Sequence, residues 1–230
     1  FTPDVAAART ILALALADGR RRLDTDEALQ LLTAYGLPVI ETWRASSPDE
    51  AAAIAAKQPG PLVLKILAPE VAHPALLGGM ASVLSTPDAV RQAAADRLAR
   101  LHDVAPTARC HGFILQPMTA RDGAYELTLG VRSGGQFGPV IYFGQGGPDA
   151  VAIDDLAYGL PPLNMHLARE IMAQTRIYQR LRYSLLRRAN LNALALALVK
   201  ISQMVIDLGE LVALDINPLW SHAQGLLALD

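Results

Sequence analysis

The sequence has few of the residues that mark several large classes of protein. Cys110 is the only cysteine among 230 residues, which excludes a disulfide framework and a cysteine-rich zinc site. The 20 basic and 22 acidic residues leave a net charge of −2, which gives no reason to expect nucleic acid or an acidic membrane surface as a partner. A lone cysteine fits a reducing, cytoplasmic setting, and we expect a soluble protein there.

Long apolar runs are also missing. The run ILALALA (11–17) is too short to cross a bilayer and has charged residues on both sides, so a helix packed on a neighbour explains it better. The chain opens on Phe1 rather than methionine, which indicates a fragment of a longer protein. With 52% hydrophobic and 18% charged residues, it is long enough to bury a core as one domain or as two packed lobes.

The order of the expected elements indicates a mixed α+β protein of two lobes rather than one doubly wound sheet. Apolar periodicity, with Ser46/Ser47 and Thr86 as caps of the second and third, predicts helices over 24–35, 46–57, 86–101, 163–181 and 189–209. Branched or alternating apolar segments predict strands over 61–67, 80–85, 110–118, 124–133 and 137–147, and a strand, turn and strand over 210–230. The strands 124–133 and 137–147 are expected to pair as a hairpin.

A lysine and a glycine-rich segment lie close together in the first half. Lys65 sits inside the apolar strand PLVLKIL, and HPALLGGM (73–80) follows it. A lone strand lysine more commonly extends to water, but it can also hold a phosphate. Gly78 and Gly79 would let backbone N–H groups approach an anion. His73 is suited to acid–base or phosphoryl-acceptor chemistry, and a histidine that only hydrogen-bonds its loop is an equal alternative.

Carboxylates and an amide form a second group of candidates. Glu126 lies on the alternating strand, and Asp215 and Asn217 of LDINPL share one strand face because side chains repeat every two residues. Asp230 follows at a hairpin distance from Asn217. An oxygen-only set of this kind suits Mg²⁺. The simpler alternative, in which Asp215 and Asn217 only build the turn at Pro218, remains open and is favoured by these residues alone.

A second glycine-rich segment, FGQGG (143–147), follows a strand. It is either a hairpin turn or a wall of a phosphate site. Neither this segment nor HPALLGGM has the spacing of a P-loop or of a dinucleotide GxGxxG loop, which excludes those two nucleotide folds.

Taken in order, seven segments resemble the ATP-grasp domain of ADP-forming acyl-CoA synthetases, the acetate–CoA ligase and succinate–CoA ligase β-subunit type. The resemblance covers about residues 22–230 and rests on AYGLPV, VLKILAPEVAHPALLGGM, FILQPM, YELTLGV, FGPVIYFGQGG, LPPLN and LDINPL. It implies a two-lobed ATP-grasp fold with the nucleotide between antiparallel sheets. The division it implies is a connecting arm (1–21), an N-terminal lobe (22–110) and a C-terminal lobe (111–230).

The resemblance also implies roles for individual residues, with ATP and Mg²⁺ as ligands. Nucleotide binding would fall to Lys65, Gly78, Gly79, Gln116, Pro117, Met118 and Glu126, with 116–118 as the adenine hinge and the glycines in the phosphate loop. Asn217 and Asp230 would coordinate Mg²⁺, and Asp215 would face an incoming phosphohistidine loop. His73 would relay a phosphoryl group. Such catalysis depends on positioned cations and a metal more than on covalent chemistry of the protein.

Some residues depart from the family pattern. The family commonly has HKSDxGGV where this chain has HPALLGGM, so Pro74, Ala75 and Leu76 replace polar residues. Ala68 stands where a serine is frequent, and Val151 aligns with a usual glutamate. Each lost hydrogen bond to a charged or hydroxyl group is worth roughly 1–3 kcal/mol, so binding or turnover should be weaker.

Two functions from different classes follow. The first is the ATP-grasp part of an ADP-forming acyl-CoA ligase, which transfers phosphate between ATP and an acyl group through phosphohistidine. It would be inactive alone, because the CoA-binding and phosphohistidine-bearing domains lie elsewhere. The second is a degenerate regulatory domain that senses nucleotide or acyl-CoA. The segments LPPLN and LAREIMAQTR resemble those of proteins in which this module is fused to a GNAT acetyltransferase. The sequence does not determine which acyl group is the substrate, whether ATP or GTP is preferred, or whether the protein is a homo-oligomer.

Overall fold

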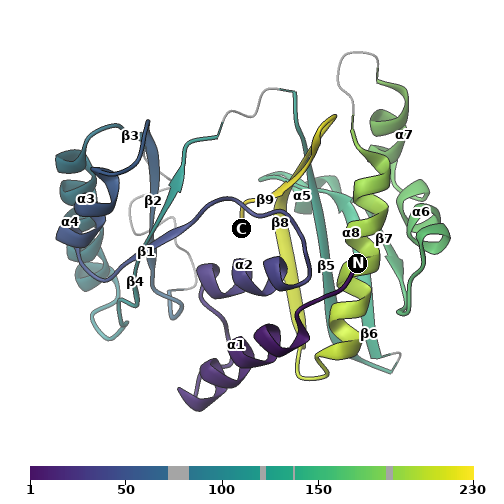
Figure 1. Ribbon diagram of the computed structural model, residues 1–230, viewed down its shortest axis with the longest axis horizontal. Coiled ribbons are helices and arrows are strands. Elements are labelled where there is room, and N and C mark those ends of the chain that lie inside the picture. The colour runs from purple at the N-terminus through teal and green to yellow at the C-terminus, as the bar shows by residue number, and fades with distance from the viewer. Residues whose placement is uncertain (72–82, 120–122, 137, 185–188) are drawn as a thin grey trace. The chain divides into compact units, whose positions relative to one another are not determined.

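The computed structural model describes residues 1–71, 83–119, 123–136, 138–184 and 189–230 (Figure 1). The chain divides into two compact units, and each draws on more than one stretch of sequence. Unit 1 comprises residues 1–14, 29–39 and 121–230, and unit 2 comprises residues 15–28 and 40–120. The lobe boundaries expected from sequence, at 21 and 110, stay a prediction.

Unit 2 contains a four-stranded antiparallel sheet in the order β1-β4-β2-β3. Its strands are β1 (Trp43–Ala45), β2 (Leu62–Leu67), β3 (Val83–Leu84) and β4 (Gly112–Pro117), and its helices are α3 (Pro48–Ala55) and α4 (Pro87–Val104). The predicted caps are confirmed: the side chains of Ser47 and Thr86 accept hydrogen bonds from backbone N–H groups in the first turns of α3 and α4.

The core of unit 2 lies between one face of this sheet and the two helices. Leu62, Leu64, Phe113 and Leu115 pack with Ala51 of α3 and with Val90 and Ala94 of α4. Because side chains alternate along a strand, Lys65, Ile114 and Gln116 lie on the opposite face. Arg44 pairs with Ile114 from the other side and shares that face.

Unit 1 contains a five-stranded antiparallel sheet in the order β7-β6-β5-β8-β9. Its strands are β5 (Tyr125–Gly135), β6 (Gly138–Gln145), β7 (Leu156–Gly159), β8 (Ala213–His222) and β9 (Gly225–Ala228). Its helices are α5 (Ala150–Ile153), α6 (Met165–Ala173), α7 (Arg176–Tyr183) and α8 (Leu191–Asp207), while α1 (Val5–Ala17) and α2 (Thr25–Ala34) extend through both sets of residues. The predicted hairpin of β5 and β6 is confirmed.

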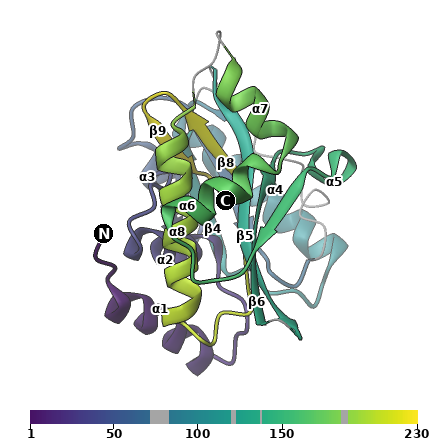
Figure 2. The same ribbon diagram turned by 90° about the vertical axis from the view of Figure 1, so that its right-hand side faces the viewer.

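Helices α6 and α8 cover one face of the unit 1 sheet, as Figure 2 shows. A Cβ added to Gly159 would lie 2.2 Å from the Ile171 side chain of α6, which identifies the covered face. Gly159 pairs with Ile141, and Ile141 with Val131, so this face carries Leu127, Leu129 and Val131 of β5, which are fully buried. Glu126, Thr128 and Gly130 therefore lie on the face that α6 and α8 leave uncovered.

The segment predicted as one helix over 163–181 forms two helices, and that prediction is wrong at residues 174–175. The Asp155 carboxylate, which is 5% exposed, accepts hydrogen bonds from the N–H groups of Arg176 (2.8 Å) and Ile177 (2.7 Å). Thr175 caps the same helix through its hydroxyl. Because an anion is favoured at a helix N-terminus, the Asp155 carboxylate stabilises the start of a new helix here. Apolar periodicity alone predicted that the first helix would continue.

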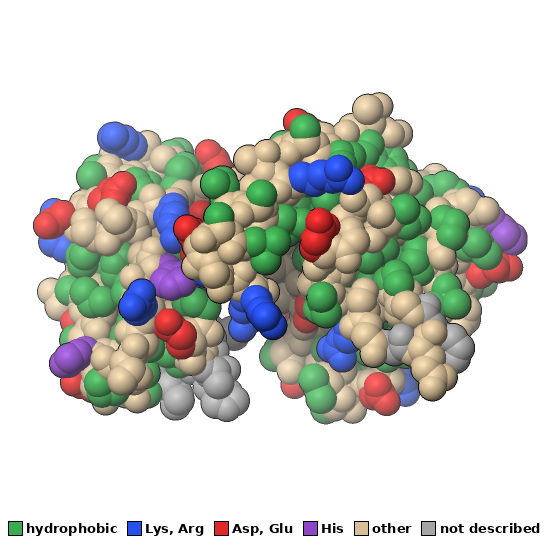
Figure 3. All heavy atoms as spheres, turned by 90° about the horizontal axis from the view of Figure 1, so that it is seen from below, with side chains coloured by type: hydrophobic (Ala, Val, Ile, Leu, Met, Phe, Trp, Pro, Cys, Tyr) green, Lys and Arg blue, Asp and Glu red, His purple; other side chains and the backbone are tan. Residues whose placement is uncertain are grey.

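Exposed side chains of different kinds are mixed on the surface. In Figure 3, acidic, basic and apolar side chains are interspersed on the face shown, which agrees with the near-neutral net charge. Among the described residues, none of the helices is long and apolar enough to span a membrane.

Candidate functional site

Asp215 lies at the centre of a hydrogen-bonded group on the uncovered face of the unit 1 sheet. Its Oδ1 accepts hydrogen bonds from the Thr128 hydroxyl of β5 (3.0 Å) and from the Tyr142 hydroxyl of β6 (2.7 Å). Three strands therefore fix one carboxylate oxygen. The residue itself is exposed, so the carboxylate also borders solvent.

The phenol of Tyr142 is a permanent donor in this group. Burial raises its pKa well above the ordinary value, and the hydrogen bond to Asp215 raises that pKa further. The guanidinium of Arg132 lies 5.6 Å from the centre of the Tyr142 ring. Tyr142 thus stays protonated and donates to Asp215 at all ordinary pH values.

Gly130 makes room for this contact. It lies on β5 between Tyr142 and Asp215, with which it pairs on either side. A Cβ at this position would lie 2.3 Å from the Tyr142 hydroxyl and 2.2 Å from the Leu214 carbonyl oxygen. Only glycine lets the Tyr142 phenol cross β5 and reach the carboxylate on β8.

The second glycine-rich segment connects Asn217 to Glu126. The backbone N–H of Gly147 donates to Asn217 Oδ1 over 2.9 Å. A Cβ on Gly147 would lie 2.4 Å from Glu126 Oε2, and the residue has φ +92°. The backbone N–H of Gly146 donates to the Glu126 carbonyl oxygen (3.0 Å). The segment is thus a close-packed turn against both side chains, and glycine is required there for space and for conformation.

Asp230 lies beside Asn217, as the hairpin spacing predicts. Strands β8 and β9 pair in antiparallel register, and the N–H of Asn217 approaches the Asp230 carbonyl oxygen at 3.3 Å. Asp230 is exposed. Unit 1 therefore brings four of the predicted residues, Glu126, Asp215, Asn217 and Asp230, to adjoining positions on strands β5 and β8 and just beyond β9.

Unit 2 holds the other described candidates on its own sheet. Lys65 is half-buried and pairs with Ile114 on the face opposite α3 and α4. Gln116 is 3% exposed, and its side-chain amide donates to the Thr42 hydroxyl (3.1 Å). The N–H of Met118 donates to the Pro61 carbonyl oxygen (2.9 Å), and its side chain is 49% exposed. Pro117, between them, ends β4.

The remaining predicted residues, His73, Gly78 and Gly79, lie outside the described residues, as do the altered positions Pro74, Ala75 and Leu76. Within the described ranges, the candidates form two sets. The oxygen-bearing set lies in unit 1, and Lys65 with the strand end 116–118 lies in unit 2.

Sequence reasoning missed Thr128 and Tyr142. Both occur in segments that carry the family resemblance, YELTLGV and FGPVIYFGQGG. The available signal was the position of Thr128 two residues after Glu126, which places both on one strand face. Nothing in the sequence pairs Tyr142 with Asp215, because that contact depends on the order of the strands.

The family model for the ATP-grasp domain matches residues 14–230. The chain therefore belongs to the ATP-grasp domain family, and the predicted α+β fold with two antiparallel sheets is confirmed. Its similarity extends specifically to ADP-forming acetate–CoA ligases, which confirms the resemblance drawn from the seven segments.

Two curated relatives show the extent of that similarity. Acetate–CoA ligase (ADP-forming) I of Archaeoglobus fulgidus is 31% identical over 205 residues, and the match covers 89% of this chain but only 30% of that protein. The β subunit of acetate–CoA ligase (ADP-forming) I of Pyrococcus furiosus is 28% identical over 227 residues, which is 98% of this chain and 97% of that subunit. The chain thus spans 30% of the length of the first relative and 97% of the second.

A solved structure agrees with the fold. The acetyl-coenzyme A synthetase 1 of Ca. Korarchaeum cryptofilum, in complex with coenzyme A, Ca-AMPCP and HgCl⁺, superposes with a TM-score of 0.88 at 28% identity. The match covers 97% of each chain.

Proposed function

We propose that this chain is the nucleotide-binding part of an ADP-forming acyl-CoA ligase and takes part in phosphoryl transfer between ATP and an acyl group through phosphohistidine. The observation that carries the proposal is the group of oxygen ligands on β8 and just beyond β9, with Asp215 held by Thr128 and Tyr142. The similarity to a ligase β subunit over nearly its whole length supports the same assignment.

The residues of unit 1 fit a magnesium ion. Asn217 and Asp230 supply an amide and a carboxylate oxygen from adjoining backbone positions. No group of three or more His, Cys, Asp or Glu side chains suited to a metal occurs among the described residues. Mg²⁺ in phosphoryl-transfer sites is usually held by one or two carboxylates together with water and substrate phosphates, so a sparse oxygen set is appropriate. Asn217 and Asp230 would hold the ion, which would neutralise phosphate charge.

The other residues would position the nucleotide. Lys65 would bind phosphate oxygens, and the strand end of Gln116, Pro117 and Met118 would contact the adenine. Glu126 would line the nucleotide site beside Gly147. The glycines 78 and 79 would belong to a phosphate loop, as the family resemblance implies.

The proposed step is a phosphoryl exchange with ADP. In the direction of ATP use, the bond between the γ-phosphorus and the bridging oxygen breaks, and ADP keeps the electron pair. A bond from phosphorus to a histidine nitrogen forms in its place. Asp215 would face this histidine and, held by Thr128 and Tyr142, would orient the ring. His73 would act as a relay in the same exchange.

Partner domains complete this reaction. The CoA-binding and phosphohistidine-bearing domains would belong to the same protein or complex, and this chain alone should not form acyl-CoA. Its use of ATP and its single cysteine fit a cytoplasmic setting.

Calorimetric titration with ATP and Mg²⁺ tests the proposal. We expect saturable binding by the wild-type chain, and a loss of about tenfold in affinity in Lys65→Ala, because one charge-assisted phosphate contact is worth about 1.4 kcal/mol or more. Lys57→Ala is the matched control, since Lys57 is exposed and precedes β2. Absence of binding at millimolar ATP, or equal binding by Lys65→Ala, rejects the nucleotide site. Incubation with γ-labelled ATP then shows whether His73 accepts the phosphoryl group.

A further inference from the structure

Unit 2 contains an arginine-lined cavity of about 600 Å³ that the proposed function does not use. Five arginines and a histidine line it, together with three acids and a proline: Arg20, Arg21, Arg22, Arg44, Arg109, His111, Asp18, Asp24, Glu70 and Pro69. The arginines and the histidine come from the loop between α1 and α2, from β1, and from the segment before β4. Its volume is within the range of sites for small organic ligands. Lys65 is not among the lining residues.

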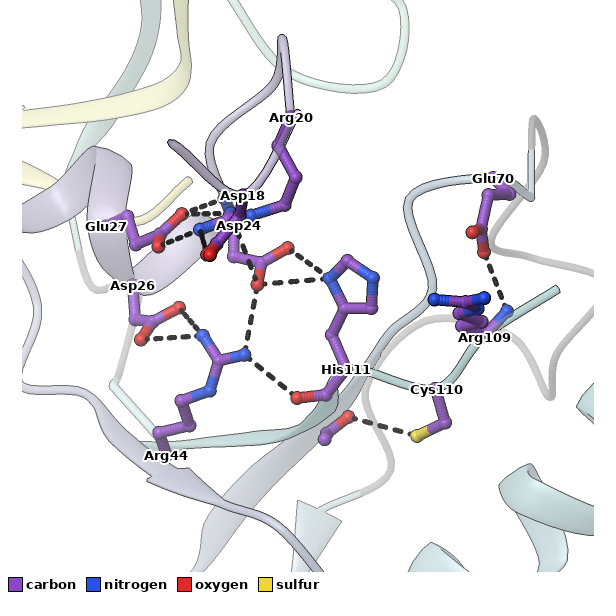
Figure 4. A network of polar contacts seen from close by, with 11 residues as sticks. Asp18, Arg20, Asp24, Asp26, Glu27, Arg44, Glu70, Arg109, Cys110 and His111 are labelled. Atoms are coloured by element: carbon purple, nitrogen blue, oxygen red, sulfur yellow. Dashed lines mark hydrogen bonds and ion pairs between the residues drawn. The ribbon is translucent and has the colours of Figure 1, made fainter. Parts of the chain in front are cut away.

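Two of the arginines are tied into the fold by carboxylates. Arg20 makes a bidentate pair with Glu27, with both distances 2.7 Å, and Arg44 contacts Asp26 (3.0 Å) and Asp24 (3.0 Å), as Figure 4 shows. The hydrogen bonds that Arg20 donates to Glu27 raise the pKa of Arg20, which keeps it charged. These two cations are thus largely neutralised, and their role is to fix the wall of the cavity.

Asp24 joins the separate segments of that wall. It is 5% exposed, and its carboxylate contacts Arg44 of β1 and His111 Nδ1 (3.2 Å) before β4 (Figure 4). Its backbone N–H donates to Glu27 Oε2 (2.8 Å), and its carbonyl accepts from Ala28 at the start of α2. The loop that carries Arg21 and Arg22 is therefore anchored at its C-terminal end to the helix and to the sheet.

The other three arginines lack such neutralisation. In the described ranges, no carboxylate lies within ion-pair distance of the side chains of Arg21, Arg22 or Arg109, and all three residues are exposed at the cavity. Glu70, which lines the same cavity, accepts the backbone N–H of Arg109 (2.8 Å), and this contact holds the Arg109 backbone in place. Three cations thus border a hollow whose walls are held by the pairs formed by Arg20 and Arg44.

We infer that this cavity binds a phosphate-bearing anion through Arg21, Arg22 and Arg109, as a site separate from the nucleotide set of Lys65, Asn217 and Asp230. The planar guanidinium fork matches phosphate oxygens in a bidentate way, and several forks around one hollow favour a multiply charged anion over a single carboxylate. The volume exceeds what one inorganic phosphate fills, which points to a diphosphate or an organic phosphate ester.

The inference does not depend on the proposed ligase activity, since it rests on residues of unit 2 that the nucleotide set does not include. Its physical requirement is that the three cations act together. Removal of two of them should therefore weaken binding much more than removal of an exposed arginine elsewhere in the same unit.

Calorimetric titration with inorganic pyrophosphate, without divalent metal, tests the site in the whole chain. We expect saturable binding that persists in Lys65→Ala and is weaker by about tenfold or more in Arg21→Ala/Arg109→Ala, because each charge-assisted contact contributes of the order of 1 kcal/mol. The control is Arg100→Ala, which removes an exposed arginine of α4. Circular dichroism melts verify that each variant folds.

Three results would overturn the inference: no pyrophosphate binding by the wild-type chain, equal losses in Arg100→Ala and Arg21→Ala/Arg109→Ala, or a loss confined to Lys65→Ala. The last two would show, respectively, nonspecific attraction and binding at the nucleotide set. Failure of the nucleotide proposal is distinct, since ATP with Mg²⁺ would then bind equally to the wild-type chain and to Lys65→Ala while pyrophosphate binding remained.

Competition experiments distinguish the sources of the phosphate. ADP, coenzyme A and dephospho-coenzyme A are each titrated into the pyrophosphate complex of Lys65→Ala. Stronger displacement by coenzyme A than by dephospho-coenzyme A assigns the site to the 3′-phosphate, and equal displacement by all three assigns it to a diphosphate group. If none displaces pyrophosphate, the assignment to a phosphate ester is wrong.

Discussion

The two units place opposite chemistry on sheets of similar construction. In each, helices cover one face and the other face carries polar residues. The uncovered face of unit 1 presents oxygen acceptors, and those of Asp215 and Asn217 are held by strands and turns of the same sheet. The corresponding face of unit 2 carries Lys65 and Arg44, and Arg44 is held by acids from the loop and helix before it.

This difference shows two ways to fix a polar side chain. Donors in adjacent strands fix Asp215 through the rigid geometry of the sheet, so a substitution at these positions disturbs the packing of the sheet. Ion pairs with acids of the loop before α2 and of its first turn fix Arg20 and Arg44, and these pairs depend on pH and ionic strength. The predictions below change one kind of support at a time.

The largest expected effect is on the strand-held group. Gly130→Ala should lower the free energy of unfolding by about 2–3 kcal/mol, because the new Cβ overlaps both the Tyr142 phenol and the Leu214 backbone. Chemical denaturation measures this loss. Gly209→Ala is the control, since nothing lies within 4 Å of a Cβ there, and it should be nearly neutral. Equal stability of the two variants would show that β5 and β8 accommodate an added methyl group without loss of stability.

A smaller, pH-dependent effect is expected in unit 2. The hydrogen bond from Arg20 lowers the pKa of Glu27 below its ordinary 4.5, so the ionised form stabilises the fold above that pH. Glu27→Gln should lose about 1–2 kcal/mol at pH 7, where the pair is intact and partly buried. The difference from wild type should shrink as pH falls below 4.5 through the folded-state pKa, because protonation removes the same interaction.

Denaturation curves at pH 7 and at low pH measure that difference, with Glu41→Gln as the control in the same unit, where the residue is exposed. A stability loss in Glu27→Gln that persists unchanged well below pH 4 would show that the charge of Glu27 is not what holds the loop.

The smallest effect concerns a single hydroxyl. Tyr142→Phe should cost about 1 kcal/mol, since it removes one hydrogen bond to Asp215 and leaves the ring in place. Tyr158→Phe is the matched control on the neighbouring strand, because Tyr158 pairs with Tyr142 and is 57% exposed. Thermal melts compare the two. If they lose the same stability, the contact between Tyr142 and Asp215 contributes nothing beyond burial of the ring.

Local patterns in the sequence predict much of this fold. Alternation predicted β5 and its partner β6, and Ser47 and Thr86 marked the starts of α3 and α4 correctly, since these features involve residues close together in the chain. The break between α6 and α7 was not predicted. It depends on hydrogen bonds from the N–H groups of Arg176 and Ile177 to the Asp155 carboxylate, which is 21 and 22 residues earlier in the chain.

The candidate site, like the fold, was predicted from the sequence only in part. The spacing of Asp215, Asn217 and Asp230 in a strand–turn–strand segment predicted that Asn217 and Asp230 adjoin, and β8 and β9 confirm that placement. The roles of these residues, and those of Lys65, Glu126 and the 116–118 segment, stay predictions that the titrations address.

By itself, the sequence determined the ATP-grasp family, most of the helices and strands, and which oxygen-bearing residues share a strand face, because short-range periodicity and ordered motifs encode all of these. Only the tertiary structure decided that Thr128 and Tyr142, 87 and 73 residues from Asp215, hold its carboxylate, and that Asp24 and His111, 87 residues apart, close one wall of an arginine-lined cavity. The physical reason is that strand order and loop anchoring, rather than local spacing, bring such distant side chains within hydrogen-bond distance.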